Sequence, residues 1–535
     1  MTEFKNIREI IEYSAKKYEN NLAFKLKKKE NGKIVYDDIT FSRLEEEIKA
    51  FGKYLIKNGL SDKRIAVIGK NSYRWMVVYL GVLCAGGVIV PLDKGLLPFE
   101  IKEQLSRSKA DLVFYADHLE EAFFDVTDTK KIVLESDEFD EIIDSGKKLD
   151  NDEEYNNIKI DNEKMSILIF TSGTTQKSKA VMLSQKNIAA NVNAMNIWET
   201  FYDTDVNLAI LPFHHAFGMT QVVLFISNGM CNVFAEGLRI ANALKEYQVS
   251  TLVGVPVILE SMKKIMLKEI KRLGMEKKFS FGLKLSGFLR KIGIDIRRKL
   301  FKDVLEKLGG KLRVMISGAA ALKPETAKFF NDIGILLIQG YGLSETAPVV
   351  AAENEKHIRY GSIGFPLPGV EVRVDGKDEN GIGELTVKGD NVMLGYYEDE
   401  ENTKAVLKDG WFSTGDMCYR DKDGYIYITG RKKNVIVLAN GKNVFPEEIE
   451  ELLSDAPIIK ECIVYNKKNG EKDALSAKIV FDTDVESDEN KVGELVKAHV
   501  DEVNSKLIRY KQIADFELTD VEMEKTTTGK IKRHS

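Results

Sequence analysis

The sequence predicts an α/β protein with a large N-terminal domain of doubly wound, mostly parallel sheets and a small α+β C-terminal domain. Short apolar runs alternate with helical patterns along most of the chain, which is typical of a mostly parallel sheet covered by helices. The chain has 535 residues, more than a single hydrophobic core accommodates. From about Arg431 onward, strands and helices are arranged instead as a compact α+β unit.

The N-terminal elements follow one another in a strand–helix order. A helix is expected to open at Ser42, where Ser42 and Glu45 form a capping box, and to end before Gly59. Its apolar stripe consists of Leu44, Ile48, Phe51 and Leu55. The next elements are expected to be a strand at 64–69, a helix at 72–85, a strand at 87–91, a helix at 98–109 and a strand at 112–115. The acidic, weakly patterned stretch 125–163 is interpreted as a surface connection.

A second α/β series and the small domain complete the chain. The second series is expected to contain strands at 167–170, 208–211, 251–253 and 312–316 and a helix at 218–228. The small domain is expected to contain strands at 459–465, 475–481 and 513–518 and a helix at 489–507. We therefore predict two domains, 1–430 and 431–535.

Composition and charge exclude several classes of protein. With 44% hydrophobic and 30% charged residues the chain is expected to be globular, and a net charge of −5 predicts no nucleic-acid partner. The cysteines contain no C-x-x-C pair, which favours a reducing cytoplasm and neither zinc nor disulfides; they are Cys84, Cys231, Cys418 and Cys462. The N-terminus lacks the apolar core of a signal peptide. The uncharged run 75–92 is broken by glycines and a proline, so it predicts a buried helix and strand rather than a membrane span.

A loop rich in small hydroxyl residues follows the strand at 167–170. It reads T-S-G-T-T-Q-K-S-K from Thr171 to Lys179. Backbone amides around Gly173 could converge on an anion, with hydroxyls and two lysines adding donors and charge, which is how a loop holds polyphosphate. The loop is not a Walker motif, because Thr171 and Gln176 stand where that motif needs glycines. A polar turn between two elements would look the same, so the loop by itself leaves both interpretations open.

Three more motifs carry chemistry. In Q-G-Y-G-L-S-E-T-A-P, from Gln339 to Pro348, two glycines leave an aromatic ring free to lie against a purine, beside a carboxylate for Mg²⁺ and a hydroxyl for a phosphate. Asp416 ends a glycine-containing turn, D-G-W-F-S-T-G-D, where a carboxylate can bind ribose hydroxyls. His214 and His215 follow a strand beside apolar residues, as at a pocket mouth, and either could be the functional one.

These motifs, in this order and over nearly the whole chain, resemble those of the acyl-adenylate-forming superfamily, and most of all the long-chain fatty acyl-CoA synthetases. The family's loop is close to T-S-G-T-T-G-x-P-K-G-V, and here Gln176, Ser178 and Ala180 replace its second Gly, its Pro and its last Gly. The tip of the loop is therefore expected to be shaped differently.

The resemblance assigns roles residue by residue. The catalytic residues would be the adenylation lysine Lys530, the α-phosphate contact Thr346 and the metal ligand Glu345. The nucleotide would also be bound by Thr171, Ser172, Gly173, Thr174, Thr175, Lys179, Gly318, Ala319, Tyr341, Asp416 and Arg431. The acid and its acyl chain would lie beside His214, His215 and Gly342. Lys433 would be the hinge, and the CoA channel would be lined by Gly441, Lys442 and Asn443.

The resemblance implies an ATP-dependent acyl-CoA synthetase for a medium- or long-chain fatty acid, using Mg²⁺ and coenzyme A. The acid would attack ATP, release pyrophosphate and form an acyl-adenylate, and rotation of the small domain would then admit the thiol. Two alternatives stay open. The acceptor could be an acyl carrier protein, or the substituted loop could mark a catalytically impaired nucleotide-binding regulator.

One strongly basic segment of the chain can be interpreted in two ways. Residues 262–313 hold seventeen Lys and Arg against five Asp and Glu, interleaved with apolar side chains. Such a segment suits an anionic membrane surface, which would make the protein peripherally membrane-associated. It also suits a helical insertion that packs its apolar side on the protein body, the interpretation we favour.

Overall fold

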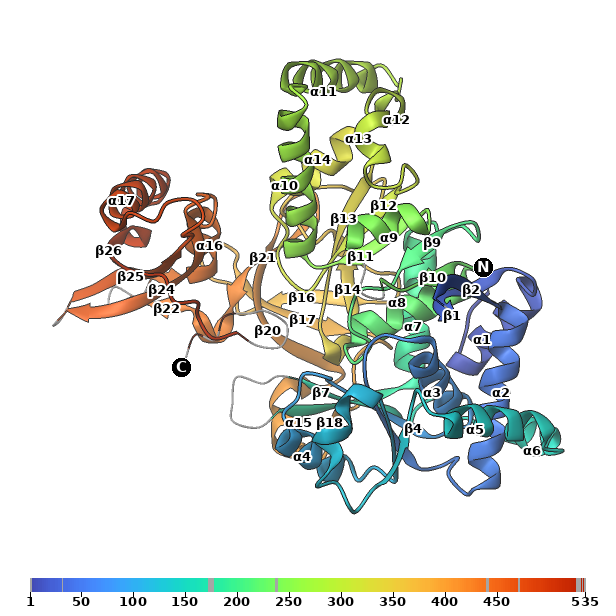
Figure 1. Cartoon of the computed structure of the whole chain (residues 1–535). Coiled ribbons are helices and arrows are strands. Elements are labelled where there is room, and N and C mark those ends of the chain that lie inside the picture. Colours follow the sequence, from blue (N-terminus) through green and yellow to red (C-terminus); the bar gives the residue numbers. More distant parts are fainter. Residues whose placement is uncertain are drawn as a thin grey trace. The chain divides into compact units, whose positions relative to one another are not determined.

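The computed structural model (Figure 1) describes residues 2–30, 32–171, 178–235, 239–438, 442–469, 472–525, 531 and 533. They fall into two compact units. The larger unit comprises Met1–Thr171, Ser178–Val372 and Val387–Phe412. The smaller unit comprises Arg373–Thr386 and Ser413–Ser535.

Two sheets form the centre of the larger unit. The first has the order β15 (Phe365–Pro366), β14 (Val349–Ala352), β13 (Leu336–Gly342), β12 (Val314–Ser317), β11 (Thr251–Gly254), β9 (Val206–Leu208), β10 (Cys231–Val233), β1 (Leu22–Glu30) and β2 (Lys33–Thr40). Neighbours from β13 to β1 pair in parallel, whereas β14, β15 and β2 are antiparallel. The second has the order β18 (Gly395–Tyr396), β8 (Lys179–Ser184), β7 (Met165–Thr171), β4 (Val88–Leu92), β3 (Arg64–Ile68), β5 (Leu112–Tyr115) and β6 (Lys130–Val133). Here β7 to β6 pair in parallel and β8 and β18 are antiparallel.

Helices cover these sheets. They are α1 (Ile7–Lys17), α2 (Phe41–Lys57), α3 (Tyr73–Cys84), α4 (Pro98–Ser108), α5 (Asp137–Lys148), α6 (Asp152–Asn157), α7 (Gln185–Trp198), α8 (Ala216–Ser227), α9 (Ile240–Glu246), α14 (Pro324–Ile333) and α15 (Glu400–Val406), with the 3₁₀ turns η1 (Asp117–Phe123) and η2 (Ser344–Thr346). Of α3 only Arg74 is not buried, because the helix has no polar face. The uncharged run 75–92 therefore divides into α3 and β4, and no helix among the described residues is long and apolar enough to cross a membrane.

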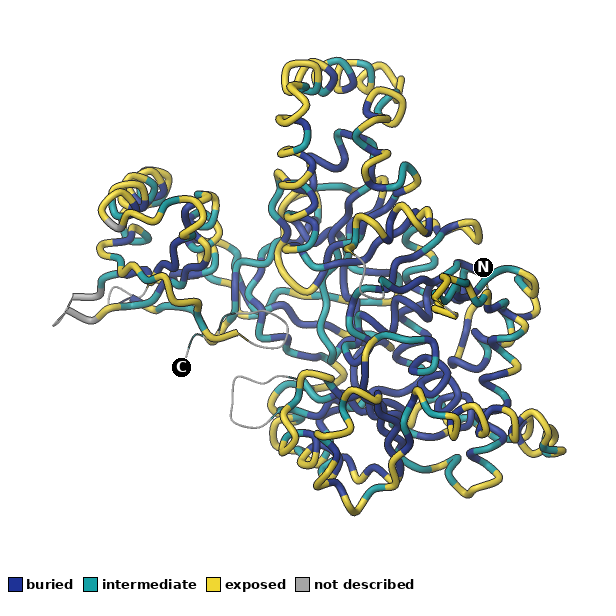
Figure 2. The backbone as a smooth tube through the Cα atoms, viewed as in Figure 1, coloured by how far each residue is buried: buried dark blue, intermediate teal, exposed yellow. Residues whose placement is uncertain are grey.

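Four helices, α10 (Pro256–Arg272), α11 (Glu276–Lys291), α12 (Arg297–Leu300) and α13 (Lys302–Glu306), stand out beyond the sheets of the larger unit (Figure 1). One side of α11 packs as the insertion hypothesis expected, since the rings of Phe279 and Phe301 lie 5.2 Å apart and Leu283 joins the same core. The other side is exposed (Figure 2), and both Phe281 and Phe288 are more than 60% accessible, at 67% and 63%.

The smaller unit is built on short antiparallel pairings and one three-stranded sheet. That sheet has the order β24 (Ile459–Asn469), β25 (Lys472–Phe481) and β26 (Ile513–Thr519), and it packs with α16 (Pro446–Leu453) and α17 (Glu489–Lys506) around one core. A further sheet, of which residues 373–386 and 413–431 belong to this unit, has the order β16 (Glu371–Asp375), β17 (Gly383–Lys388), β20 (Trp411–Arg420) and β19 (Leu407–Lys408), with β21 (Ile426–Arg431) paired to β20. The remaining elements are β22 (Ile436–Val437), β23 (Asn443–Val444), η3 (Lys432–Asn434) and η4 (Arg509–Lys511).

The predicted fold class, α/β with mostly parallel sheets in a large N-terminal part and a smaller α+β part, is confirmed. Two local predictions are wrong. Helix α2 begins at Phe41, because Thr40 leaves β2 in an extended conformation and its Oγ1 accepts a hydrogen bond from the Arg43 amide (3.2 Å), so Ser42 and Glu45 form no capping box. The stretch 125–163 is not a mere connection: it contains β6, α5 and α6, and α5 buries Phe139, Ile142 and Ile143.

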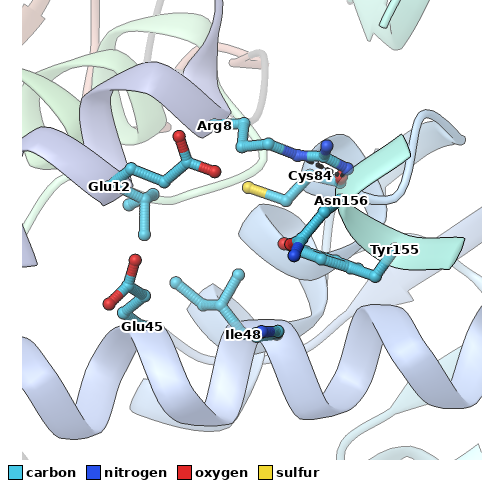
Figure 3. A pocket seen from close by; sticks show the side chains of 9 residues that line it. Arg8, Glu12, Glu45, Ile48, Cys84, Tyr155 and Asn156 are labelled. Carbon is cyan, nitrogen blue, oxygen red and sulfur yellow. Dashed lines mark hydrogen bonds between the residues drawn. The ribbon is translucent and has the colours of Figure 1, made fainter. Parts of the chain in front are cut away.

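A polar cavity of about 130 Å³ lies among α1, α2, α3 and α6 (Figure 3). The Arg8 guanidinium donates from Nε to the carbonyl of Cys84, the last residue of α3 (3.0 Å), and lies 4.5 Å from the centre of the Tyr155 ring. It therefore satisfies a carbonyl that a helix end leaves without a partner. Burial, with the neighbouring charge of Glu12, raises the pKa of Glu45 on the cavity wall. The Arg8 side chain on the wall of this cavity thus ties α1 to α3.

Candidate active site

The predicted phosphate loop joins two paired strand ends. Thr171 and Lys179 are Cα partners at the end of the β7–β8 hairpin, and Thr171 Oγ1 donates to the Lys179 carbonyl (3.3 Å). Beside them, Arg107 donates to Ser178 Oγ (3.2 Å) and to the Ser178 carbonyl (2.8 Å). The serine that replaces the family's proline is therefore anchored by a guanidinium. Ser172, Gly173, Thr174, Thr175 and Gln176 lie outside the described residues.

Gly318 and Ala319 follow the carboxyl end of β12, at the edge where ligands approach a parallel sheet. A Cβ on Gly318 would lie 2.6 Å from the Phe217 ring of α8, so this position has no room for a side chain. Ala319 adopts a φ of 69°. The space beside the end of β12 is therefore narrow, and the Phe217 ring bounds it on one side.

The Gly-Tyr-Gly motif ends β13, directly beside β12. Ser317 and Gln339 are Cα partners, so Gly318 and Tyr341 extend from neighbouring points of the same sheet edge. A Cβ on Gly342 would lie 1.8 Å from the Pro348 carbonyl oxygen, so only glycine allows the chain to turn back here. Thr346 is fully buried, and its hydroxyl donates to the Pro348 carbonyl (2.6 Å). In this arrangement the Thr346 hydroxyl closes the turn that carries Glu345.

Glu345 receives a hydrogen bond that sequence reasoning missed. The Tyr396 hydroxyl, on β18, donates to Glu345 Oε1 (3.0 Å), and the Lys179 ammonium lies 4.5 Å from the centre of the Tyr396 ring. The three residues therefore form a chain that links the base of the phosphate loop to the predicted metal ligand. Tyr396 stands in no motif, and only the pairing of β18 with β8 brings it there.

The histidine pair belongs to an acid–base cluster with Asp93, which directly follows β4. His214 Nε2 lies 3.4 Å from Asp93 Oδ2, and the two imidazole rings are 4.1 Å apart. Burial, together with the neighbouring His214, lowers the pKa of His215 to about 4. Burial alone would raise the pKa of Asp93, but His214 outweighs it and the pKa is lowered. His215 is therefore neutral at physiological pH, and His214 is the partner of the carboxylate. Asp93 also was missed, although its place directly after a parallel strand was a usable signal.

In the smaller unit, Asp416 and Arg431 face one another across β20 and β21. They are Cα partners, and Arg431 Nε lies 2.7 Å from Asp416 Oδ1. Asp416 is only 4% exposed. The sequence placed both at the ribose, and the fold brings them together as an ion pair.

The predicted hinge and CoA-channel residues lie in the same unit. Lys433 is in η3, and burial, with the charges of Arg431 and Arg533, lowers its pKa. The Lys442 ammonium lies 4.4 Å from the centre of the Tyr510 ring, and Asn443 pairs with Val437 in the β22–β23 hairpin. Gly441 and Lys530 lie outside the described residues.

The donor set fits a metal that is held mainly by a substrate. Mg²⁺ prefers oxygen ligands and commonly takes one or two carboxylates plus the phosphates of a nucleotide. Glu345 offers such an oxygen, and within the described residues no cationic side chain pairs with it. No group of three or more His, Cys, Asp or Glu in that part of the chain could hold a metal by itself. A site completed by nucleotide phosphates is the arrangement these residues support.

Comparison with known proteins decides the family. The model of the AMP-binding enzyme family matches residues 11–397, and that of the AMP-binding enzyme C-terminal domain matches residues 433–535. The chain belongs to the AMP-binding enzyme family. The predictions of an AMP-forming acid–thiol ligase, and of ATP, Mg²⁺ and CoA as its cofactors and co-substrate, are confirmed at the level of this family.

Sequence relatives of this AMP-binding enzyme are named as fatty-acid ligases, and solved structures share its fold. The long-chain-fatty-acid–CoA ligase of Bacillus subtilis (strain 168) is 27% identical, over 99% of this chain and 93% of the relative. The chloroplastic long-chain-fatty-acid–[acyl-carrier-protein] ligase of Arabidopsis thaliana is also 27% identical, over 86% of this chain and 75% of the relative. ATP-bound MatB from Rhodopseudomonas palustris has the same fold, with a TM-score of 0.77 at 22% identity over 99% of this chain and 97% of that structure.

Proposed function

We propose that this AMP-binding enzyme activates a medium- or long-chain fatty acid as its acyl-adenylate and transfers the acyl group to coenzyme A. The observation that carries the proposal is one sheet edge: Gly318 follows β12, Tyr341 lies at the end of the neighbouring parallel strand β13, and Glu345 lies in the turn after β13. The names of the relatives at 27% identity support the fatty-acid substrate.

The chemistry follows from charge. A carboxylate is a poor acyl donor, because its leaving group would be oxide, and exchange of that oxygen for AMP makes transfer possible. Acid and ATP are both anions, so the site must offset their repulsion with fixed donors and cations, and no protein nucleophile is required. Bound Mg²⁺ would supply part of that compensation at Glu345. Tyr341 would stack on adenine, Asp416 and Arg431 would bind the ribose, and Lys530 would approach the α-phosphate.

Two half-reactions test this assignment. Substituting Lys530→Ala is expected to lower acid-dependent pyrophosphate exchange by roughly 10²–10³-fold, because one charged transition-state contact is lost. Thiolysis of supplied acyl-adenylate should persist, because that step does not need the lysine. Substituting the exposed Lys404 of α15 with Ala is the matched control. Survival of both half-reactions in Lys530→Ala would refute the role of Lys530, and absence of exchange in the unmodified enzyme with any acid would favour the regulator instead.

One screen can identify both the acyl acceptor and the chain length of the acid. Acids from acetate to stearate are incubated with ATP and with either CoA or a phosphopantetheine-bearing carrier protein. We expect maximal turnover with CoA and an acid of medium or long chain. The name of the Arabidopsis relative motivates the carrier-protein arm, and turnover with that acceptor only would reverse the choice.

We place the hinge at Lys433, between domains 1–430 and 431–535. Proline is tolerated in the first turn of a helix, so Lys433→Pro keeps the conformation of η3 and restricts others. If the small domain must rotate between the steps, thioester formation slows more than pyrophosphate exchange. Equal slowing of both steps would argue against a hinge here.

A peripheral membrane contact through residues 262–313 is the second part of the proposal. Phe281, Phe288 and Ile292 share one exposed face of α11, at intervals of seven and four residues. Lys277, Lys278, Lys284 and Lys291 surround them, and among the described residues none of these lysines forms an ion pair. Apolar side chains ringed by cations suit an anionic lipid surface.

Vesicle binding tests the contact. The quadruple Lys→Gln variant of this face should bind vesicles of anionic lipid more weakly and keep its turnover with a short, soluble acid. The matched control replaces four lysines elsewhere, Lys5, Lys57, Lys102 and Lys497. Equal binding by the two variants would end the membrane proposal.

A further inference from the structure

Glu353 is a buried acid that no part of the predicted site uses. It directly follows β14 and is 2% exposed. Its Oε2 accepts a hydrogen bond from the Gln339 amide (3.0 Å), and its Oε1 accepts one from the Arg359 amide (2.7 Å). The Glu353 amide in turn donates to the Gln339 carbonyl (2.9 Å). One side chain thus ties the end of β13 to the loop that returns through Arg359.

Gln339 links the two residues that we expect on either side of the adenine, Gly318 and Tyr341, which are called the adenine walls below. Two residues beyond it on β13 stands Tyr341, and its partner on β12 is Ser317, the residue before Gly318. The Gln339 side chain also accepts a hydrogen bond from the Leu322 amide (3.1 Å), which lies in the segment that follows Ala319. A displacement of the Gln339 backbone would therefore move both walls.

We propose that Glu353 is a positioning residue for nucleotide binding, whose ionised carboxylate fixes the Gln339 backbone and through it the spacing of Tyr341 and Gly318. The inference rests on the proposed function, because it takes this edge as the adenine site. Charge matters because an ionised carboxylate accepts on both oxygens, and hydrogen bonds to a charged acceptor are the stronger ones. A protonated carboxyl keeps only one carbonyl oxygen for the two amides.

The surroundings of Glu353 make this charge titrate near neutrality. Burial raises its pKa to about 7, and the two backbone amides oppose that rise only in part. Tyr360 feels the charge of Glu353, together with those of Asp332 on α14 and Arg290 on α11. The other charged or titratable side chains of the loop are Glu355, Lys356, His357 and Arg359. Since burial is the largest cause of the shift, the carboxylate gains its proton as pH falls through about 7.

Affinity and stability should respond to this proton with opposite signs. The folded-state pKa lies above the ordinary glutamate value of 4.5, so ionisation of Glu353 lowers the stability of the folded state. The contribution of Glu353 to stability is full below pH about 4.5 and is lost as pH rises through about 7. Nucleotide affinity should instead increase over the same range, because the ionised form holds the walls. A residue with a purely structural role would move affinity and stability in the same direction.

The test measures adenosine binding by equilibrium dialysis between pH 5.5 and 8.5, with Tm measured at each pH. Adenosine is chosen because it has no phosphate, and phosphates titrate in this range. For the unmodified enzyme we expect the Kd to fall about three- to tenfold as pH rises through 7, while the Glu353 contribution to Tm declines. In Glu353→Gln, whose side-chain NH₂ cannot accept a hydrogen bond, the Kd should stay at the low-pH value throughout. Exposed Glu325 of α14, substituted with Gln, is the matched control.

Each outcome bears on the proposal. A flat Kd profile in the unmodified enzyme, or the same transition in Glu353→Gln, would overturn it. If the Gln variant fails to fold, the profile of the unmodified enzyme still decides, through the opposite signs of Kd and Tm. Acid-dependent pyrophosphate exchange is measured on the same preparation: exchange without the Kd transition refutes only the role of Glu353, whereas absence of both adenosine binding and exchange refutes the proposed function as well.

Discussion

The two units hold their predicted site carboxylates in different ways. In the smaller unit, Asp416 is paired with the guanidinium of Arg431 at 2.7 Å and is 4% exposed. In the larger unit, Glu345 accepts a hydrogen bond from the neutral Tyr396 hydroxyl at 3.0 Å, and no cation pairs with it among the described residues. Within the described residues, a guanidinium offsets the charge of Asp416, whereas no cationic side chain offsets that of Glu345.

This difference matches the ligands that the two acids are proposed to bind. Ribose hydroxyls are neutral, so a carboxylate that binds them needs a fixed orientation more than a net charge, and an arginine partner fixes the plane of the carboxylate. A metal ion is held by charge, so its ligand is more effective without a protein cation beside it. We therefore infer the ligand of each carboxylate from the side chain that it pairs with in the protein. Three substitutions test this inference.

The largest effect is expected from Glu345→Gln. Loss of the Glu345 charge should lower kcat/KM for adenylation by roughly 10²–10³-fold and raise the Mg²⁺ concentration needed for half-maximal exchange. A Mg²⁺ titration of pyrophosphate exchange measures both. Asp416→Asn serves as the comparison and should leave the Mg²⁺ midpoint unchanged; identical midpoints in the two variants would remove the distinction between the two acids.

Substituting Asp416→Asn should cost about 10–10²-fold in kcat/KM for ATP, since hydrogen bonds to a charged group contribute roughly 1.5–3 kcal/mol. The sharper readout is the preference for ATP over 2′-deoxy-ATP, which the variant should lose. Because Arg431 would be left without its carboxylate, Asp416→Leu combined with Arg431→Met controls for that unpaired charge. A variant that still discriminates between the two nucleotides would show that Asp416 does not bind the ribose.

The smallest effect is expected from Tyr396→Phe. The hydroxyl donates to a charged acceptor, a bond of about 1.5–3 kcal/mol, but the carboxylate keeps its charge and loses only its orientation. We therefore expect only part of that energy to be lost from the transition state, roughly 2–10-fold in kcat/KM. The neighbouring Tyr397→Phe is the matched control, since the Tyr397 hydroxyl binds Arg64 (2.6 Å) and not Glu345. Equal losses in both variants would mean that the tyrosines support only the fold.

Much of the fold was predictable because burial imposes periodicity on the sequence. The bounds of the mostly apolar helix α3 and of the short strands β3, β4 and β5 were predicted to within one or two residues. Helix α5 was missed because its acidic residues dominate the composition of 125–163, although Phe139, Ile142 and Ile143 are spaced as one helical face. The start of α2 was misplaced because Thr40 competes with Ser42 as a cap, and only the path of β2 decides between them.

The sequence allowed a candidate site to be proposed where its residues are adjacent along the chain. The Gly-Tyr-Gly segment and the turn at Glu345 form one continuous stretch, and each residue type there implies its chemistry. Asp93, Tyr396 and Glu353 were not found, because their partners are brought together by strand pairing: Tyr396 is 51 residues from Glu345. Tyr396 and Glu353 carry no local signal of these contacts, whereas the place of Asp93 directly after β4 was the one signal available.

The place of β1 beside β10 has a consequence for how the chain is made. Asn232 donates from its side chain to the carbonyl of Ala23, 209 residues earlier, and α1 packs against α8. At roughly 5–20 residues per second, the first strand waits on the order of 10–40 s on the ribosome before its neighbour is synthesised. Helix α1 also packs against α2 and α3, which are synthesised soon after it, so these helices can cover part of its apolar side, with Ile7, Ile10 and Ile11, before α8 is made. The contacts of α1 with α8 and of β1 with β10 therefore form only after a long stretch of intervening chain has been made.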